Sequence, residues 1–348
     1  MWSRIRVTSP FLRRVVSHRS FTTATKDTRI GIVGCGNVGQ AVTKNLIGAG
    51  FNVVSAYDID TTRVSALGSS KIKEAKTPRE VVENVDVLIT GLPIPSAVRA
   101  ASEGPDGILE GLTKDKIWID HSTTDYEQTL SYNSIALDKG AHILEAPITG
   151  GMRALKKGNM VVFIGGEKAL SDAMQPILQV NYSAVYYIGP MGTAMITKVV
   201  SNMLNAVGLI AAGEALMLAK KSGIDMKTYW EAIRVSSGNS FVWETGVPEV
   251  YTAKYDPSFS MELHCKDLQL GHEFAQKFRV PMAMNQLALS IFRQAQYQYG
   301  DDAGCYSAPK LLEDALQTPL QDERFKNWTF DNDIINGNVV TKHYGVEE

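Results

Sequence analysis

The feature that most constrains the fold is the stretch "RIGIVGCGNVGQAVTKNL", in which an apolar run ends in glycines and passes into helical spacing. The glycines are Gly34, Gly36 and Gly39, the GxGxxG spacing of a dinucleotide-binding turn. The first permits a tight turn, the second lets the backbone approach a pyrophosphate, and the third lets helix and strand pack closely. The order strand, glycine turn, helix predicts the first unit of a Rossmann-type sheet. An ordinary glycine turn is the alternative.

A second predicted strand, "NVVSAYD", ends in an acid, Asp58, about 20 residues beyond the glycines. A carboxylate at this strand end can accept hydrogen bonds from both adenosine ribose hydroxyls, and it repels a 2′-phosphate. We therefore predict that the cofactor is NAD rather than NADP. The residues predicted to contact it in this first unit are Gly34, Gly36, Asn37, Val38, Gly39 and Asp58.

Strand and helix signals then alternate as far as Gly189, with further strands predicted at "DVLITGLP", "KIWIDHST", "AHILEAPITG", "MVVFIGG" and "AVYYIGP". Such alternation predicts a mostly parallel sheet covered by helices. Leu92 and Pro93 follow one of these strands directly. Ligands of open α/β sheets bind outside the carboxyl ends of the strands, so this loop is predicted to border the cofactor. A rigid proline loop without a ligand contact is an equal alternative on the sequence alone.

After Gly189 the strand signal disappears, and the long apolar stretch "TAMITKVVSNMLNAVGLIAAGEALMLA" is followed by further segments of helical period. A chain of 348 residues, 44% of them hydrophobic, suits two domains. We predict a Rossmann-type α/β domain over residues 29–190 and an all-helical domain over residues 191–348, linked by a long interdomain helix. The polar stretch from Asp322 to the end is weakly patterned and gives no prediction.

One lysine, Lys198, lies in that apolar helix, four residues before Asn202. Hydride transfer from an alcohol also requires a base for the hydroxyl proton. Burial lowers the pKa of a lysine, and residues four apart on a helix share a face, so both side chains could reach one substrate. Two alternatives remain: the lysine reaches water from near the helix end, or the helix spans a membrane. A membrane span would place Asn202, Asn205 and Glu214 in hydrocarbon.

Five segments in this order resemble the β-hydroxyacid dehydrogenase family: "GIVGCGNVGQAVTKNL", "DHSTTD", "APITGGMRALKKGNMVVFIGG", "GPMGTAMITKVVSN" and "CKDLQL". The resemblance extends from about Arg29 to Asp314. It implies the following roles: Lys198 as catalytic acid/base, Asn202 assisting in substrate binding, Ser122 with the N–H groups of Gly150 and Gly151 as carboxylate receptor, and Thr123 and Lys266 against the cofactor.

The same residues also have plainer interpretations. Ser122 and Thr123 could cap the helix that follows them, the glycine pair could be only a turn, and Lys266 could be a solvated charge. His121 is a second candidate base, although no carboxylate stands at a spacing that would orient it.

The chain departs from the family pattern at several positions. Ala194 stands where a third glycine is usual, Glu145 stands where aspartate is usual, and Ala97 stands where a polar cofactor contact can occur. The proline that commonly follows the Ser-Thr element is absent, and the tail beyond about Gln317 is longer than usual. These departures bear on the substrate more than on the reaction type.

The resemblance implies NAD-dependent oxidation of a small 3-hydroxy acid, with 3-hydroxyisobutyrate of valine breakdown, oxidised to methylmalonate semialdehyde, as the expected substrate. One alternative is an NADPH-dependent glyoxylate or succinic semialdehyde reductase of the same family, which Asp58 disfavours. Another is a catalytically inactive nucleotide-binding module, which the presence of both Lys198 and Asn202 disfavours.

The composition limits which binding partners and which cellular compartment are expected for this protein. The first 28 residues carry five arginines, many hydroxyls and no acid before Asp27, which predicts a mitochondrial transit peptide and a matrix protein, or else a basic tail that stays attached. A net charge of -2 gives no reason to expect nucleic acid or a membrane surface as partner. Cys35, Cys265 and Cys305 predict free thiols and no metal site. The apolar helix predicts a homo-oligomer, a dimer or tetramer.

Overall fold

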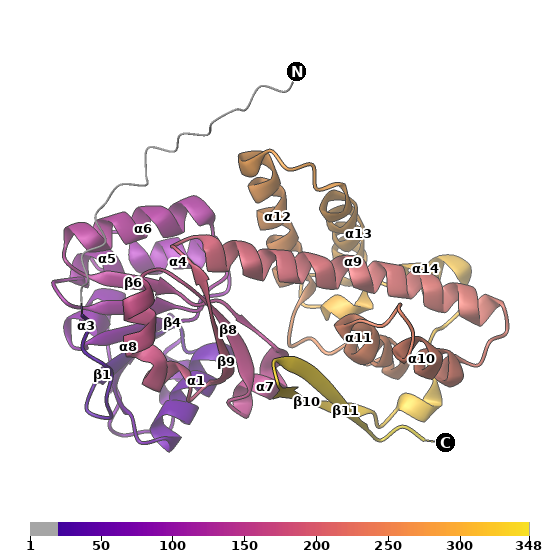
Figure 1. Ribbon diagram of the computed structural model, residues 1–348, viewed down its shortest axis with the longest axis horizontal. Coiled ribbons are helices and arrows are strands. Elements are labelled where there is room, and N and C mark those ends of the chain that lie inside the picture. The colour runs from indigo at the N-terminus through magenta and orange to yellow at the C-terminus, as the bar shows by residue number, and fades with distance from the viewer. Residues whose placement is uncertain (1–19, 348) are drawn as a thin grey trace.

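The structure, a computed structural model, describes residues 20–347 and consists of a sheet domain at the start of one long helix and a helical domain packed along that helix (Figure 1). The strands of the first domain are β1 (Arg29–Val33), β2 (Asn52–Tyr57), β3 (Lys73–Glu74), β4 (Val87–Thr90), β5 (Ile117–Asp120), β6 (His142–Glu145), β7 (Ile148–Thr149), β8 (Met160–Gly165) and β9 (Tyr182–Gly189).

These strands form one sheet in the order β3-β2-β1-β4-β5-β6-β8-β7, with β9 paired to β8. Strands β1 to β6 run parallel, β8 is antiparallel to β6 and β7, and β9 is parallel to β8. The prediction of a mostly parallel Rossmann-type sheet is confirmed. The apolar central strands β1, β4, β5 and β6 are buried because helices cover both faces.

The helices of this domain are α1 (Asn37–Gly48), α2 (Thr61–Ser65), α3 (Pro78–Glu83), α4 (Pro95–Ser102), α5 (Ile108–Gly111), α6 (Tyr126–Asp138), α7 (Gly151–Lys156) and α8 (Lys168–Leu178). Polar side chains begin several of them: the Thr77 hydroxyl accepts from the N–H of Glu80, and the Asp125 carboxylate accepts from the N–H of Gln128.

The second domain is built on α9 (Thr193–Lys221), with α12 and α13 on one side and α10 and α11 on the other (Figure 1). Its other elements are α10 (Met226–Arg234), α11 (Phe241–Thr252), α12 (Met261–Phe278), α13 (Ala283–Tyr299), η1 (Cys305–Ser307), α14 (Lys310–Leu316), η2 (Glu323–Phe325), β10 (Thr329–Ile335) and β11 (Asn338–Tyr344). Within the described residues, α9 alone is long and apolar enough to cross a membrane. It packs on α11, α12 and α13, as the core helix of a domain does.

The prediction that this domain is helical throughout was wrong for its tail. Strands β10 and β11 form an antiparallel hairpin whose turn residues, Asn336 and Gly337, have φ of 51° and 77°. Asn-Gly is the strongest short sequence signal for such a turn, because both central residues need a positive φ. That signal stands in "DIINGNVV" and would have identified the hairpin.

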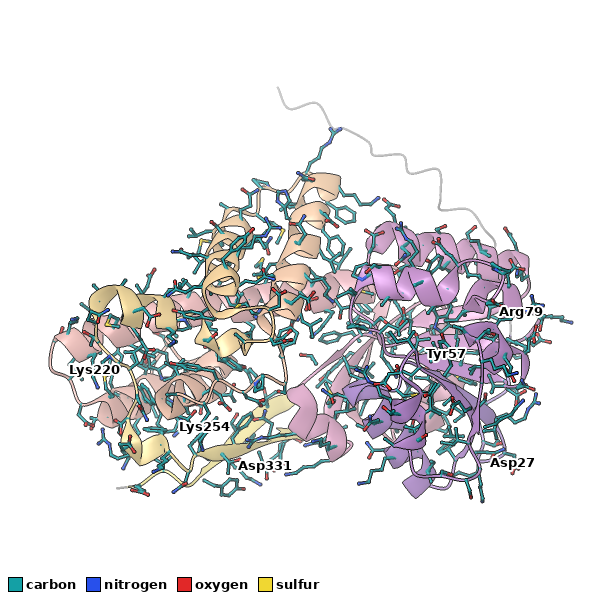
Figure 2. All side chains as sticks on the ribbon, turned by 180° about the vertical axis from the view of Figure 1, so that it is seen from behind. Asp27, Tyr57, Arg79, Lys220, Lys254 and Asp331 are labelled. Carbon is teal, nitrogen blue, oxygen red and sulfur yellow. The ribbon has the colours of Figure 1, made fainter. Side chains whose placement is uncertain are left out.

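The tail joins the two domains. Phe325 and Trp328, just before the hairpin, are buried in the helical core. The hairpin then reaches α7 of the sheet domain, where Asp331 lies 2.5 Å from the Lys157 ammonium and the Asn332 carbonyl accepts from the Asn159 side chain at 2.6 Å. Figure 2 labels Asp331 on this hairpin, beside α7.

The N-terminal segment is described only in part. Residues 1–19, most of the predicted transit peptide, lie outside the described residues. Residues 20–28, which we assigned to the same peptide, lie on the sheet domain: the Phe21 ring meets His142 edge-on at 4.8 Å, and Ala24 is buried. Phe21 and Ala24 are therefore part of the folded domain.

Candidate active site

Lys198 lies in the second turn of α9 and faces α12. Its ammonium donates to the Asn202 side-chain oxygen at 3.0 Å, as the four-residue spacing predicts. The pKa of Lys198 is lowered to about 8, because burial outweighs the Asp267 carboxylate, which raises the pKa, and the Lys266 ammonium adds a smaller lowering. The side chain is partly buried rather than extended into water. A lysine with this pKa can both accept and donate a proton near neutral pH.

Asp267, on α12, is a member of this site that we did not predict. Its side chain is 2% exposed, and its carboxylate accepts from the side-chain amide of Asn202. The Lys266 ammonium lies 2.9 Å from its other oxygen. The segment "CKDLQL" contains Asp267, but only the fold shows that the carboxylate meets the side chains of α9.

Lys266 connects α12 to the loops of the sheet domain. Its ammonium donates to the Thr123 carbonyl at 2.8 Å and to the Pro93 carbonyl at 3.2 Å. Beside it, the N–H of Leu92 donates to the Ser122 hydroxyl at 3.0 Å. The interpretation of Lys266 as a solvated charge is wrong. Polar contacts thus run from Lys198 across both domains to the carboxyl ends of β4 and β5.

Ser122 and Thr123 do not cap the following helix, because Asp125 caps α6. Ser122 is held instead by Asp120, the last residue of β5, whose carboxylate accepts from the Ser122 N–H at 2.9 Å and from the Thr90 hydroxyl at 2.6 Å. Burial raises the pKa of Asp120, and these hydrogen bonds oppose the shift. The Asp-x-Ser-Thr segment is therefore a braced turn at the sheet edge.

The glycine turn has the geometry that a dinucleotide requires. Gly34 has φ of 91°, and a Cβ on Gly39 would lie 1.9 Å from the Gly34 carbonyl oxygen, so neither position tolerates a side chain. A Cβ on Gly36 would meet only the Arg63 guanidinium at 3.9 Å, which leaves the surface above this glycine open. Asn37 and Val38 begin α1, and its N-terminal N–H groups face that surface.

Asp58 lies against this turn and accepts from the N–H groups of Cys35 at 2.7 Å and Asp60 at 2.9 Å. Each carboxylate oxygen has a second lone pair, so two hydroxyl groups can still be bound. The residues present therefore fit a dinucleotide. Arg63, which we did not predict, is the cation beside the turn, and its guanidinium lies 3.3 Å from the Asp60 carboxylate.

Gly150 is the N-cap of α7 and Gly151 is its first residue, with φ of 127° and 81°. Both values favour glycine and expose backbone N–H groups. Among the contacts of residues 20–347, none joins this pair to Lys198 or Ser122. Their predicted role as a carboxylate receptor stays a prediction.

His121 is not placed as a base. It is buried, with Nδ1 2.7 Å from the Ala146 carbonyl oxygen and Nε2 3.0 Å from the Tyr182 hydroxyl. Burial lowers the pKa of His121 to about 4, so the ring is neutral near pH 7. The contacts describe a core histidine with satisfied nitrogens.

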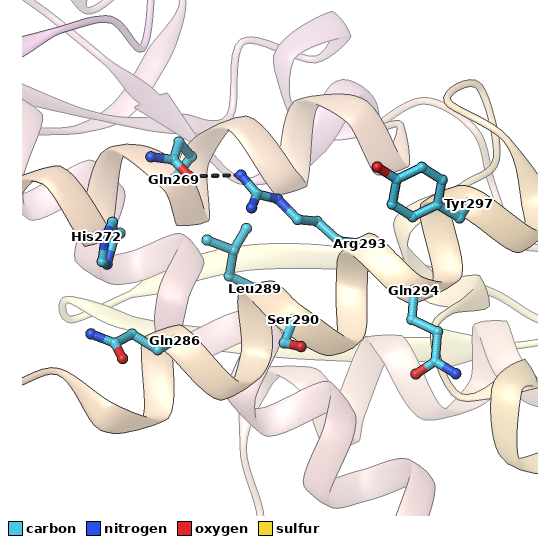
Figure 3. A pocket seen from close by; sticks show the side chains of 8 residues that line it. All are labelled: Gln269, His272, Gln286, Leu289, Ser290, Arg293, Gln294 and Tyr297. Carbon is cyan, nitrogen blue, oxygen red and sulfur yellow. Dashed lines mark hydrogen bonds between the residues drawn. The ribbon is translucent and has the colours of Figure 1, made fainter.

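A broad surface hollow lies elsewhere, between α12 and α13 (Figure 3). Its lining residues are Gln269, His272, Gln286, Leu289, Ser290, Arg293, Gln294 and Tyr297. None of them belongs to the predicted site, and the Arg293 guanidinium is bound to the Gln269 side chain. The Lys198 site is therefore defined by its contacts and not by this hollow.

Comparison with known proteins agrees with this geometry. Residues 29–189 match the family model for the NAD binding domain of 6-phosphogluconate dehydrogenase. Residues 192–312 match the model described as NAD-binding of NADP-dependent 3-hydroxyisobutyrate dehydrogenase. The hairpin lies beyond both matches.

Two relatives and one solved structure illustrate the similarity. The mitochondrial 3-hydroxyisobutyrate dehydrogenase of Mus musculus is 31% identical over 275 residues, 76% of this chain and 81% of that one. The 2-(hydroxymethyl)glutarate dehydrogenase of Eubacterium barkeri is 29% identical, over 77% of this chain and 89% of its own. The structure of Mycobacterium tuberculosis 3-hydroxyisobutyrate dehydrogenase with L-serine has a TM-score of 0.75 at 26% identity, covering 82% of this chain and 99% of that one.

The glycine turn, the braced Ser-Thr turn and the lysine helix thus occur on a chain that matches these proteins over both domains. The protein belongs to the β-hydroxyacid dehydrogenase family and is an oxidoreductase with an NAD(P)-binding domain.

Proposed function

We propose that this protein oxidises a small 3-hydroxy acid with NAD, and that the acid is 3-hydroxyisobutyrate, which becomes methylmalonate semialdehyde. The observation that carries the proposal is Lys198, a partly buried amine whose pKa is lowered to about 8 where the two domains meet. The names of the relatives from mouse and Mycobacterium tuberculosis support the choice of substrate.

In the proposed reaction the Lys198 amine accepts the proton of the substrate hydroxyl. The Asn202 side-chain oxygen accepts a hydrogen bond from the amine. Because the Asn202 amide nitrogen donates to Asp267, the oxygen of the same amide is kept pointing at Lys198. Ser122 and the N–H groups of Gly150 and Gly151 bind the substrate carboxylate. NAD, when bound, supplies the ring that accepts the hydride.

We propose NAD rather than NADP because of Asp58. Its carboxylate is fixed against the turn by two N–H groups and would repel a 2′-phosphate. The residues that would hold the cofactor are those of the glycine turn with Leu92, Pro93, Thr123 and Lys266.

A second candidate is an NADPH-dependent glyoxylate or succinic semialdehyde reductase. The observation in its favour is Arg63, whose guanidinium lies beside Gly36 and could meet a phosphate. A protein of Arabidopsis thaliana with this name is 26% identical. The pairing of Arg63 with Asp60 favours the first candidate, because the guanidinium already has a carboxylate partner.

The test is a substrate panel on purified protein. 3-Hydroxyisobutyrate, L-serine, 2-(hydroxymethyl)glutarate, glyoxylate and succinic semialdehyde are each assayed with both cofactors, by nicotinamide absorbance. The proposal predicts the highest kcat/KM for 3-hydroxyisobutyrate with NAD. A higher value for glyoxylate or succinic semialdehyde with NADPH would establish the second candidate instead.

We further propose that the protein works in the mitochondrial matrix. The basic N-terminal stretch supports import. Because Phe21 and Ala24 are packed on the sheet domain, the proposed presequence ends before Phe21 rather than at residue 28. N-terminal sequencing of protein recovered from mitochondria tests this, and a mature chain that begins after Ala24 would contradict it.

We also propose a homo-oligomer in which a second copy covers the outer face of α9. This face of the apolar helix exposes two large apolar side chains, Leu204 at 61% and Leu218 at 71%. A protein surface is the better match for this face than a membrane, since Glu214 lies on it too.

A further inference from the structure

Glu145, the last residue of β6, is a buried carboxylate that the proposed reaction does not use. It is 1% exposed. Its two oxygens accept from the backbone N–H groups of Ala194 at 2.9 Å and Met195 at 3.3 Å. These N–H groups belong to the first turn of α9, so one side chain of the sheet domain holds the start of the helix that carries Lys198.

The start of α9 needs such a partner. Its N-cap residue is Gly192, which has φ of 95° and no side chain to accept from the free N–H groups. A Cβ on Gly192 would lie 2.4 Å from the Tyr126 ring, so a side-chain cap at this position is sterically excluded. The helix is therefore capped from another strand.

Room for the carboxylate is also part of the fold. Glu145 pairs with Gly165 where β6 meets β8. A Cβ on Gly165 would lie 1.9 Å from a Glu145 carboxylate oxygen, and it would also clash with Cδ and Cγ of the same side chain. Any larger residue at position 165 would displace the carboxylate from α9.

The charge of Glu145 is compensated by the helix and not by a cation. Among the described residues, the groups that face it are the α9 N–H donors, Asp120 and Tyr126. The pKa of Glu145 is raised to about 7, because burial outweighs the N–H groups at the start of α9, which lower the pKa, and Asp120 adds a smaller rise. The positive end of a helix favours an anion at this place.

The geometry relates Glu145 directly to the catalytic lysine. Ala194 and Lys198 are four residues apart and so lie one above the other on the same side of α9. A shift of the first turn is therefore passed on to the Lys198 ammonium and to Asn202 one turn later.

We propose that Glu145 is a positioning residue: by capping α9 from the end of β6, it sets the place of the Lys198 amine relative to the sheet domain. This inference rests on the proposed function, since it assigns Glu145 a part in the same reaction. It gives a role to one of the positions at which the chain departs from the usual family residue.

The experiment compares Glu145→Gln, Glu145→Asp and Gly165→Ala with the unsubstituted protein. Gln keeps the shape, but it turns one acceptor into a donor that opposes the α9 N–H groups. We expect kcat to fall about tenfold or more in Glu145→Gln, with the Kd for NADH and the KM for the hydroxy acid within about twofold. Asp keeps the charge and should retain more of kcat than Gln.

The pH profile of kcat separates positioning from stability, because a loss of stability alone would not shift it. The titratable groups near Lys198 are Asp267, Lys266 and the buried His264, and Asn202 is its hydrogen-bond partner; all four are unchanged in these variants. If loss of the cap shifts the first turn of α9, the Lys198 ammonium moves away from the Asp267 carboxylate, which is the charge that raises its pKa. The limb of the profile due to Lys198 should move to lower pH in Glu145→Gln and stay in place in Glu145→Asp.

The matched control is Asp225→Asn. Asp225 is also an acidic helix cap, accepting from the N–H of Thr228 at 2.9 Å, but it caps α10 at the distant end of the helical domain. Its kcat should equal that of the unsubstituted protein. Gly165→Ala displaces the carboxylate but leaves Glu145 itself intact, and it should also lower kcat. It therefore tests the proposal even if Glu145→Gln does not fold.

Two measurements separate this inference from the proposed function. If Lys198→Ala abolishes turnover while folded Glu145→Gln or Gly165→Ala keeps the kcat and pH profile of the unsubstituted protein, the positioning role is overturned and the function stands. If no substrate turns over, hydrogen exchange decides. Faster exchange at the Ala194 and Met195 amides in Glu145→Gln would support the cap, and unchanged exchange would overturn it.

Discussion

Asp267 is the carboxylate that raises the pKa of Lys198, against the larger effect of burial. Oxidation requires the neutral amine, so kcat for oxidation should rise as pH increases through about 8. Asp267→Asn removes the opposing charge, and this limb should move to lower pH. A kcat–pH profile of both proteins checks the shift, and a limb that moves upward would contradict the arrangement.

Asp58 is the residue on which the proposed preference for NAD over NADP depends. Replacing it with serine removes the charge that would repel a 2′-phosphate while keeping an acceptor for the Cys35 N–H. We expect the ratio of kcat/KM with NADP to that with NAD to rise at least tenfold. Asp60→Ser, which changes the neighbouring acid that pairs with Arg63, is the matched comparison. An unchanged ratio in Asp58→Ser would remove the argument for NAD.

Among the elements, the C-terminal tail has the clearest consequence for stability. Phe325 is fully buried, with its ring 5.3 Å from that of Trp230 and 4.9 Å from that of Tyr251. Phe325→Ala should reduce the free energy of unfolding by about 3–5 kcal/mol. Ile335→Ala, at a half-exposed position of the hairpin, should change it by less than about 0.5 kcal/mol. Urea denaturation measures both, and equal effects would show that the tail is no part of the core.

The elements also show what could be predicted from the sequence. The strands and the helix α9 followed from periods of apolar residues and from glycine and proline at their ends, because those signals are local. The hairpin was missed because its alternation is masked by polar residues such as Asp331 and Asn332, although the Asn-Gly turn was visible.

The predicted site followed partly from local motifs and partly from the resemblance. The role of Asp267 and the cap formed by Glu145 could not be predicted, because each depends on side chains brought together from distant segments: Asn202 with α12 in one case, and β6 with α9 in the other.

At the scale of the whole molecule, the proposed assembly makes its own prediction. If a second copy covers α9, Leu204→Glu places a charge in that contact and should shift sedimentation velocity toward the monomer. Val235→Glu, at a position 90% exposed beside α10, should leave the oligomer unchanged. A monomer in the unsubstituted protein at micromolar concentration would contradict the assembly, and recovery in the membrane fraction would favour the alternative of a membrane helix.

Turnover by Lys198→Ala tests most directly whether this amine is the acid/base of the reaction. We expect kcat to fall by about 10²–10⁴-fold while the Kd for NADH stays within about threefold, because the amine moves a proton and the glycine turn binds the nucleotide. Lys220→Ala, near the far end of the same helix, should keep the kcat of the unsubstituted protein. A Lys198→Ala protein that turns over 3-hydroxyisobutyrate at an unchanged rate would rule out Lys198 as the acid/base.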